Sequence, residues 1–261
     1  MDGAVQLILG HPDYCMLLFL RTSGLLVGNP IFGHKGIPAY VKIAFSFALT
    51  VLFINLVPQP QVWPQYGNII GYGLLCMDEL VFGLAMSFVM TAVFDLTLTA
   101  GSMIDMQIGF SMANIYDIQN GTQASITGSI YNVMFIILFL GENAHLRVID
   151  ILYKTIERVP IGHITISPDI MWSAGQVMSE TFVLALMLSM PIIASGLMAE
   201  IAMGAMVRTV PQMNMFVVGI PVKILVGLVV LGTTFTMFVG FSGEMMNTMF
   251  RYIDQMFAYI T

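Results

Sequence analysis

The chain has 261 residues, of which 57% are hydrophobic and only 9% charged, and its mean hydropathy is +0.87. A water-soluble domain carries about 25% charged residues, so the composition excludes a cytosolic enzyme and a disordered tail. Nine basic residues against fifteen acidic ones give a net charge of −6. A duplex-binding protein needs an excess of Lys and Arg, so we expect no nucleic-acid partner.

Six apolar segments, separated by Gly and Pro, follow one another along the chain. They are expected at about residues 14–27, 40–57, 69–99, 126–140, 175–206 and 222–241. Apolar runs of this length are typical of membrane helices. The first thirteen residues contain Asp2 and Asp13 but no Lys or Arg, whereas a secretory leader begins with basic residues. We therefore expect an all-α protein that enters the membrane through its internal segments.

Two segments do not fit a simple membrane span. Residues 69–99 would extend over about 46 Å at 1.5 Å per residue, against a hydrocarbon core of about 30 Å. They contain Asp78, Glu79 and Asp95, and the segment 175–206 contains Glu180 and Glu200. A carboxylate at the bilayer centre costs at least about 2.5–3.5 kcal/mol. Both segments are therefore expected to face protein or to extend beyond the lipid.

The distribution of basic residues predicts no orientation in the membrane. If the segments alternate, each side receives four cations. One side has Lys35, Lys42, Arg208 and Lys223, and the other has Arg147, Lys154, Arg158 and Arg251. The positive-inside rule then gives no direction, which is unusual for a polytopic membrane protein.

Two stretches are predicted to be amphipathic helices that lie on a partner or at an interface. In residues 142–160, Leu146, Ile149, Tyr153 and Ile156 recur at steps of three and four, the spacing of one helix face. The second stretch is the tail after Gly243. We find no repeat and no internal boundary, so residues 1–261 are predicted to form a single domain.

A Met-, Ile- and Phe-rich loop is expected at residues 100–121, between two apolar helices. Such a loop must be buried in protein or line a cavity, because lipid cannot satisfy its backbone polar groups. It is either a re-entrant packing loop or a plug that narrows a passage. Methionine, with 23 copies in the chain, suits a deformable seal because its side chain is flexible.

Other polar features leave alternatives open. The adjacent pair Asp78–Glu79 either crosses a polar interface or forms a salt bridge to a basic residue of another subunit. In residues 200–223, Pro211 and Pro221 are expected to break helices, and Arg208 and Lys223 flank the break. These cations could pair with Glu200 or with a neighbour's carboxylate. Two cysteines and four scattered histidines show no metal-ligand spacing, so we expect no metal and no cofactor.

The motif from Arg208 to Lys223 closely resembles the signature of the FliR/SctT family of type III secretion export-gate proteins. Its matching positions are Arg208, Pro211, Gln212, Met213, Asn214, Phe216, Gly219, Pro221 and Lys223. Three further stretches resemble the family in the same order along the chain. They begin at Arg21 (with Pro30, Phe32, Gly33, Pro38 and Lys42), at Ala100 (with Gly101, Ile104, Asp105, Gln107, Gly109 and Phe110) and at Pro191 (with Glu200 and Gly204).

The resemblance implies a fold of hydrophobic helical hairpins, packed with partner subunits in a helical ring rather than a simple six-span bundle. It implies FliP and FliQ homologues as partners around a pore, further contact with FlhB and FlhA homologues, and unfolded flagellar proteins as substrates. It places the protein in the bacterial inner membrane at the flagellar basal body, extending towards the periplasm. It implies no catalysis and no cofactor.

By the same resemblance, one segment forms the pore plug and a second set of residues serves assembly. The plug would be Met106, Gln107, Ile108, Gly109, Phe110, Ser111, Met112, Ala113 and Asn114, with Phe110 and Met112 as the main sealing side chains. The assembly residues would be Arg21, Asp78, Glu79, Glu200, Arg208, Pro211, Gln212, Asn214, Phe216, Pro221 and Lys223.

Three other functions are considered beside the flagellar one. The chain could serve an injectisome of the same family. It could be a secondary transporter with a site around Glu200 and Arg208, or a membrane enzyme that uses Asp78 or Asp105. The last has no nucleophile or metal constellation in support.

Overall fold

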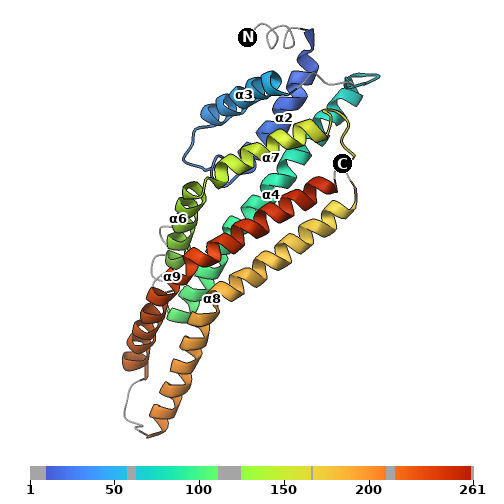
Figure 1. The fold of residues 1–261 in the computed structure, drawn as a ribbon. Helices are drawn as coiled ribbons and strands as arrows, with labels where there is room; N and C mark the ends of the chain where they lie inside the picture. Colours follow the sequence, from blue (N-terminus) through green and yellow to red (C-terminus); the bar gives the residue numbers. More distant parts are fainter. Residues whose placement is uncertain (1–9, 58–62, 111–124, 166, 210–214, 260–261) are drawn as a thin grey trace. The chain divides into compact units, whose positions relative to one another are not determined.

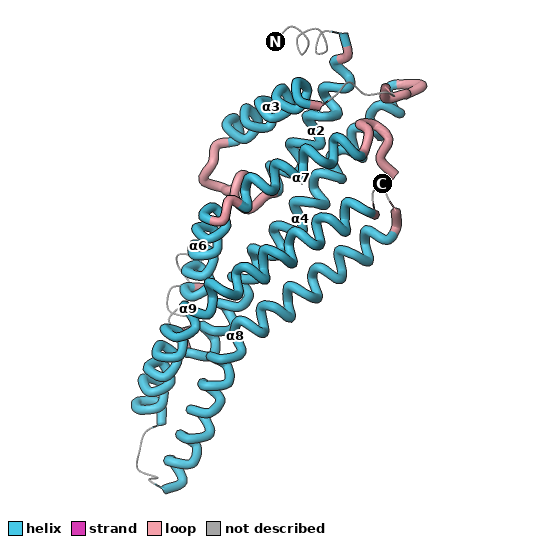
Figure 2. The backbone as a smooth tube through the Cα atoms, viewed as in Figure 1, coloured by secondary structure: helices cyan, strands magenta, loops and turns pink. Residues whose placement is uncertain are grey.

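The computed structural model describes residues 10–57, 63–110, 125–165, 167–209 and 215–259. Within these ranges every regular element is a helix, which confirms the all-α prediction (Figure 1). The helices are α2 (Pro12–Gly28), α3 (Ala39–Leu56), α4 (Ile69–Ile108), α6 (Ile126–Gly141), α7 (Ala144–Arg158), α8 (Asp169–Thr209) and α9 (Met215–Ala258). Figure 2 shows that the described loops are short connections between them.

All six predicted apolar segments are helices, but three are longer than expected. Helices α4, α8 and α9 have 40, 41 and 44 residues. Residues 100–108, predicted as part of a loop, are the last turns of α4, because their apolar and polar side chains suit a helix as well as a buried loop. The tail after Gly243 is not a separate helix but continues α9.

Pro221 does not break a helix. It lies inside α9, six residues after the first helical residue, Met215. A proline removes one backbone hydrogen bond, but at this position it does not interrupt the 44-residue helix. The prediction of a break at Pro221 is therefore wrong, while Pro211 lies outside the described residues.

The predicted amphipathic helix at residues 142–160 is α7, but its buried face only partly matches the predicted one, with Ile156 common to both. Its interior side chains follow the four-residue steps Val148, Leu152 and Ile156, while Leu146 is 55% exposed. Steps of three and four fit more than one face of this helix, so neighbouring helices determine which face is buried.

The described helices fall into two compact units, and the boundaries between them divide α4, α6, α8 and α9. The first consists of residues Met1–Ala92, Leu140–Val177 and Thr248–Thr261. The second consists of residues Val93–Phe139 and Met178–Asn247. The single predicted domain spans both.

In the first unit, α2 and α4 cross through small residues. A Cβ atom on Gly83 would lie 2.5 Å from the carbonyl oxygen of Arg21, and one on Gly28 would lie 2.1 Å from Ser87 Oγ. Glycine lets two helix backbones approach closely, as is common between membrane helices. The close crossing brings neighbouring polar side chains of α2 and α4 within reach of one another.

In the second unit, an aromatic cluster joins α4, α6 and α9. The ring centroids of Phe94 and Phe135 lie 4.7 Å apart, and those of Tyr131 and Phe238 also lie 4.7 Å apart. The Tyr131 hydroxyl also lies 3.2 Å from Thr234 Oγ1. Buried aromatic pairs of this geometry add about 0.5–1.5 kcal/mol each beyond their buried area, and they fix α6 against α4 and α9.

Candidate functional site

The end of α4, where the predicted plug begins, combines interior and exposed side chains. Ile108 is 1% exposed, whereas Met106 is 70% exposed. Gln107, Gly109 and Phe110 are partly exposed, and Gly109 ends the helix with a φ of 101°, which glycine adopts without strain. The other predicted plug residues, Ser111, Met112, Ala113 and Asn114, lie outside the described residues.

The last turn of α4 packs against glycines on two neighbouring helices. A Cβ atom on Gly196 of α8 would lie 2.6 Å from Gln107 Nε2, and one on Gly227 of α9 would lie 2.6 Å from Ile108 Cγ1. Ile108 is therefore part of the protein's own packing, although it was predicted to help seal a pore. Met106 and Phe110 have the exposed surface that a sealing side chain needs.

Asp105 ties the end of α4 to the start of α6. Its carboxylate accepts hydrogen bonds from Ser125 Oγ at 2.7 Å, from Thr127 Oγ1, and from the Thr127 backbone N–H at 3.3 Å. Ser125 Oγ in turn accepts a hydrogen bond from the backbone N–H of Gly128 at 2.8 Å. This is the hydrogen bond that an N-cap residue makes at the start of a helix. A carboxylate at a helix N-terminus is also favoured by the helix dipole.

This arrangement, which we call the Asp105 clamp (Asp105, Ser125 and Thr127), holds both ends of the segment between Gly109 and Ser125. The two helices also touch beside it, because a Cβ atom on Gly101 would lie 2.0 Å from Gly128 Cα. The enzyme hypothesis assigned Asp105 a catalytic role. The structure instead uses its carboxylate to cap α6.

Replacing Asp105 by Ala should lower the free energy of unfolding by roughly 1–3 kcal/mol, because it leaves the buried Thr127 N–H and hydroxyl without their acceptor. Asp95→Ala is the matched control, since Asp95 is an exposed acid of the same helix, and should shift stability by less than about 0.5 kcal/mol. Thermal unfolding of the detergent-solubilised chain measures both. Equal midpoints for the two variants would contradict the clamp.

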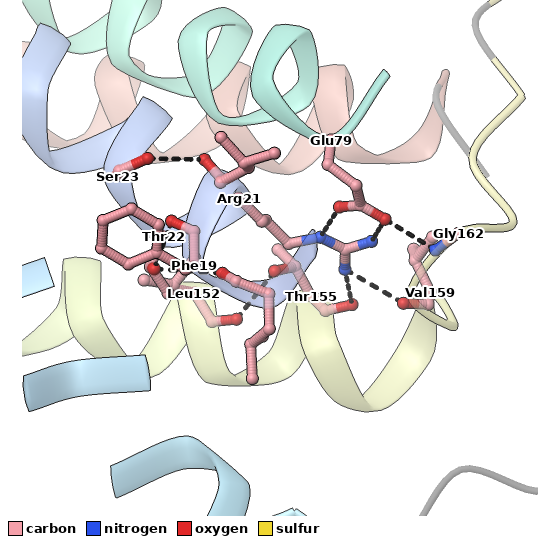
Figure 3. A network of polar contacts seen from close by, with 11 residues as sticks. Phe19, Arg21, Thr22, Ser23, Glu79, Leu152, Thr155, Val159 and Gly162 are labelled. Atoms are coloured by element: carbon pink, nitrogen blue, oxygen red, sulfur yellow. Dashed lines mark hydrogen bonds and ion pairs between the residues drawn. The ribbon is translucent and has the colours of Figure 1, made fainter. Parts of the chain in front are cut away.

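A buried ion pair in the first unit joins α2, α4 and α7 (Figure 3). Arg21 Nε donates to Glu79 Oε2 at 2.6 Å and Arg21 Nη2 donates to Glu79 Oε1 at 3.0 Å. Both side chains are fully buried, with 0% of their surface exposed. A salt bridge from the Asp78–Glu79 pair to another subunit was one of the predicted alternatives, whereas Glu79 has its partner within the chain. Asp78, the neighbouring acid, is only partly buried.

The same arginine caps the end of α7. Arg21 Nη1 donates to the carbonyl oxygens of Thr155 at 3.1 Å and Val159 at 3.0 Å, and the Gly162 N–H donates to Glu79 Oε1 at 2.7 Å (Figure 3). The last carbonyls of a helix carry partial negative charge, and that of Thr155 also accepts the N–H of Val159 at 2.9 Å. A buried cation therefore satisfies them and the Glu79 carboxylate together. These backbone partners were not predicted, since carbonyl groups have no sequence signal.

The remaining predicted assembly residues lie in the last turns of α8, in the first turns of α9 and between the two helices. Lys223 Nζ forms an ion pair with Glu200 Oε1, which confirms that one of the flanking cations pairs with Glu200. Arg208 is exposed and forms no ion pair with any described residue. The transporter hypothesis placed a site around Glu200 and Arg208, and of these two residues Glu200 has Lys223 as its ion-pair partner. Pro211, Gln212, Asn214 and the side chain of Phe216 are outside the described residues.

Four of the described helices, α3, α4, α8 and α9, are long and apolar enough to cross a membrane. In the part of the chain that the structure describes, no three His, Cys, Asp or Glu side chains come close enough to hold a metal ion. The described helices pack closely at glycines and are joined by buried polar contacts. Together they define an all-α integral membrane protein.

The chain belongs to the family of bacterial export proteins, family 1, whose model matches residues 14–249. It is similar to the flagellar biosynthetic protein FliR of Bacillus subtilis, with 32% identity over 219 residues that cover 83% of each chain. It is 26% identical to FliR of Escherichia coli over 89% of this chain and 88% of the relative. It is 25% identical to FliR of Aquifex aeolicus over 83% of each chain. The resemblance found in the sequence is thus confirmed.

Proposed function

We propose that this chain is a core subunit of the flagellar type III protein export gate, in the bacterial inner membrane at the basal body. With FliP and FliQ homologues it would form the pore through which unfolded flagellar proteins leave the cell. FlhB and FlhA homologues would contact this gate. The subunit itself would make and break no bonds and would need no cofactor. Family membership and the FliR relatives support this proposal, and their names favour a flagellar over an injectisome role.

The observation that carries the proposal is the apolar surface along the longest helices. At 1.5 Å per residue, the 44 residues of α9 extend over about 66 Å, twice a hydrocarbon core of about 30 Å. In the apolar stretch of α9 that could cross a membrane, only 22% is buried within the chain, against 61% in the corresponding stretch of α4. Its large exposed apolar side chains include Val217, Leu225, Val229 and Met237. Lipid cannot cover that whole length, so partner subunits would have to.

The Asp105 clamp supports the plug role of the segment that follows α4. A gate needs a closing segment that moves while its attachment points stay fixed. The clamp fixes the end of α4 to the start of α6, and Phe110 offers apolar surface just beyond it. We propose that Phe110 and Met112 close the pore to ions and water, that an unfolded substrate displaces them, and that flexible Met side chains repack around it.

Co-purification tests the proposed function. The chain should be recovered in a stable complex only when it is expressed with the FliP and FliQ homologues of the same bacterium. Arg208→Ala should reduce the recovered complex, because an exposed arginine with no ion-pair partner among the described residues is available to a neighbouring subunit. Lys35→Ala, an exposed loop cation, is the control. A monodisperse chain that is stable alone and binds neither partner would contradict the proposal.

Replacing Phe110 and Met112 together by glycine should make the assembled gate leak ions, since it removes the apolar bulk at the narrow point. The control is Met171→Gly, an 80% exposed residue in the first turn of α8. Conductance of membranes that contain the closed complex measures the leak. If the double variant conducts no more than the control, the plug lies elsewhere.

A further inference from the structure

A polar groove lies between α7 and the last turns of α9, within the first unit. Its volume is about 450 Å³. Three cations of α7, Arg147, Lys154 and Arg158, line it together with the carboxylates of Asp150 and Asp254 and the ring of Phe257. In a chain with nine basic residues and a net charge of −6, three cations in one groove are a marked concentration of positive charge.

Helix spacing places these cations on one side of α7. Residues 147, 154 and 158 are separated by steps of seven and four, which bring side chains onto the same helix face. The opposite face, with Val148, Leu152 and Ile156, is already buried against the rest of the chain. The apolar face of α7 is therefore not available for insertion into lipid, and what α7 presents outward is its basic face.

Two of the three cations have no carboxylate partner within the described residues. Lys154 forms an ion pair with Asp150 at 2.7 Å. The Arg147 guanidinium instead lies 4.1 Å from the ring centroid of Phe250, and that of Arg158 lies 6.0 Å from the ring centroid of Phe257. A guanidinium stacked on a ring keeps its N–H donors in its own plane, where they can bind an oxyanion. Phe250 thus holds Arg147 in position without neutralising it, while Arg158 lies at the outer limit of a cation–π contact with Phe257.

We propose that this groove binds the phosphate of an anionic phospholipid headgroup. The fork of an arginine matches phosphate geometry, and basic pockets beside membrane helices are common headgroup sites. Helix α7 directly follows the apolar helix α6 and precedes the membrane-capable α8, which suits a position near the membrane surface. Three cations against two carboxylates leave too little net charge to hold a free ion strongly. A lipid, however, is held near the groove by its own acyl chains, which raises its effective concentration.

Lipid retention by the full chain in detergent tests the site. Native mass spectrometry of the chain mixed with phosphatidylglycerol or phosphatidylcholine gives the preference for the anionic lipid. Each cation near the membrane surface contributes about fivefold to that preference, so Arg147→Gln/Arg158→Gln should reduce it roughly 25-fold. The control Lys35→Gln/Lys42→Gln removes the same charge at two positions outside the groove and should retain most of the preference.

A second variant tests the site by gain of binding, so that the result does not depend on losing a side chain that packs on an aromatic ring. Asp254→Asn removes a carboxylate from the groove and should raise phosphatidylglycerol retention severalfold. Equal losses in the two double variants would mean a bulk charge effect and would overturn the proposal. So would an unchanged preference in Arg147→Gln/Arg158→Gln. Displacement of the lipid by millimolar inorganic phosphate would assign the groove to the free ion instead.

Discussion

Replacing Arg21 by Met should destabilise the chain by about 3–5 kcal/mol, the largest effect we expect from a single substitution. The change leaves the Glu79 carboxylate buried without its cation, and both side chains are 0% exposed in the native structure. It also removes the hydrogen bonds that Arg21 donates to the Thr155 and Val159 carbonyls at the end of α7, although Thr155 keeps its bond from the Val159 N–H. Thermal unfolding in detergent, followed by tryptophan fluorescence, measures the loss.

Two controls separate the ion pair from general damage. The double variant Arg21→Met/Glu79→Leu removes both charges and should recover most of the stability, because a buried pair can often be replaced by apolar residues without loss. Lys154→Ala breaks a pair whose side chains are 52% exposed and should cost less than about 1 kcal/mol. A loss for Arg21→Met no larger than that of Lys154→Ala would show that the buried network does not hold α2, α4 and α7 together.

The sequence predicted which segments are helical because apolar runs bounded by Gly and Pro have few alternatives in a membrane protein. It did not predict the ends of the long helices. Gly219, Pro221 and Gly243 are local helix-breaking signals, yet α9 passes through all three. Local propensity costs at most a few kcal/mol at such positions, and packing between helices exceeds it. The same limit applies to α7, whose buried face depends on neighbours distant in sequence.

The candidate site could be predicted in part. Arg21 and Glu79 are conspicuous as charges in apolar segments, but their 58-residue separation hides that they pair with each other. Asp105 was found through the family motif, whereas its partners Ser125 and Thr127 were missed. A usable signal existed, because Ser125 directly precedes the apolar helix α6 and serine is a favoured N-cap. Which acceptor its hydroxyl would reach depends on how α4 crosses α6.

Replacing Gly101 by Ala should destabilise the chain by about 1–3 kcal/mol, the cost of forcing an extra methyl group into a close contact. Helix propensity alone predicts the opposite sign, since Gly→Ala gains up to about 1 kcal/mol inside a helix. The added Cβ would lie 2.0 Å from Gly128 Cα and 2.1 Å from Gly128 N. These are backbone atoms that no rotamer change can move, so α4 and α6 would have to separate.

Separation at Gly101 would also open the Asp105 clamp, since Asp105 lies one turn further along α4 and Thr127 is adjacent to Gly128. Amide hydrogen exchange at residues 127–128 should therefore accelerate along with the loss of stability. Gly240→Ala in α9 is the matched control, because a Cβ atom there meets nothing within 4 Å, and it should be neutral or stabilising. If Gly101→Ala and Gly240→Ala shift the unfolding midpoint in the same direction, the close crossing of α4 and α6 does not exist in solution, and the clamp loses its support.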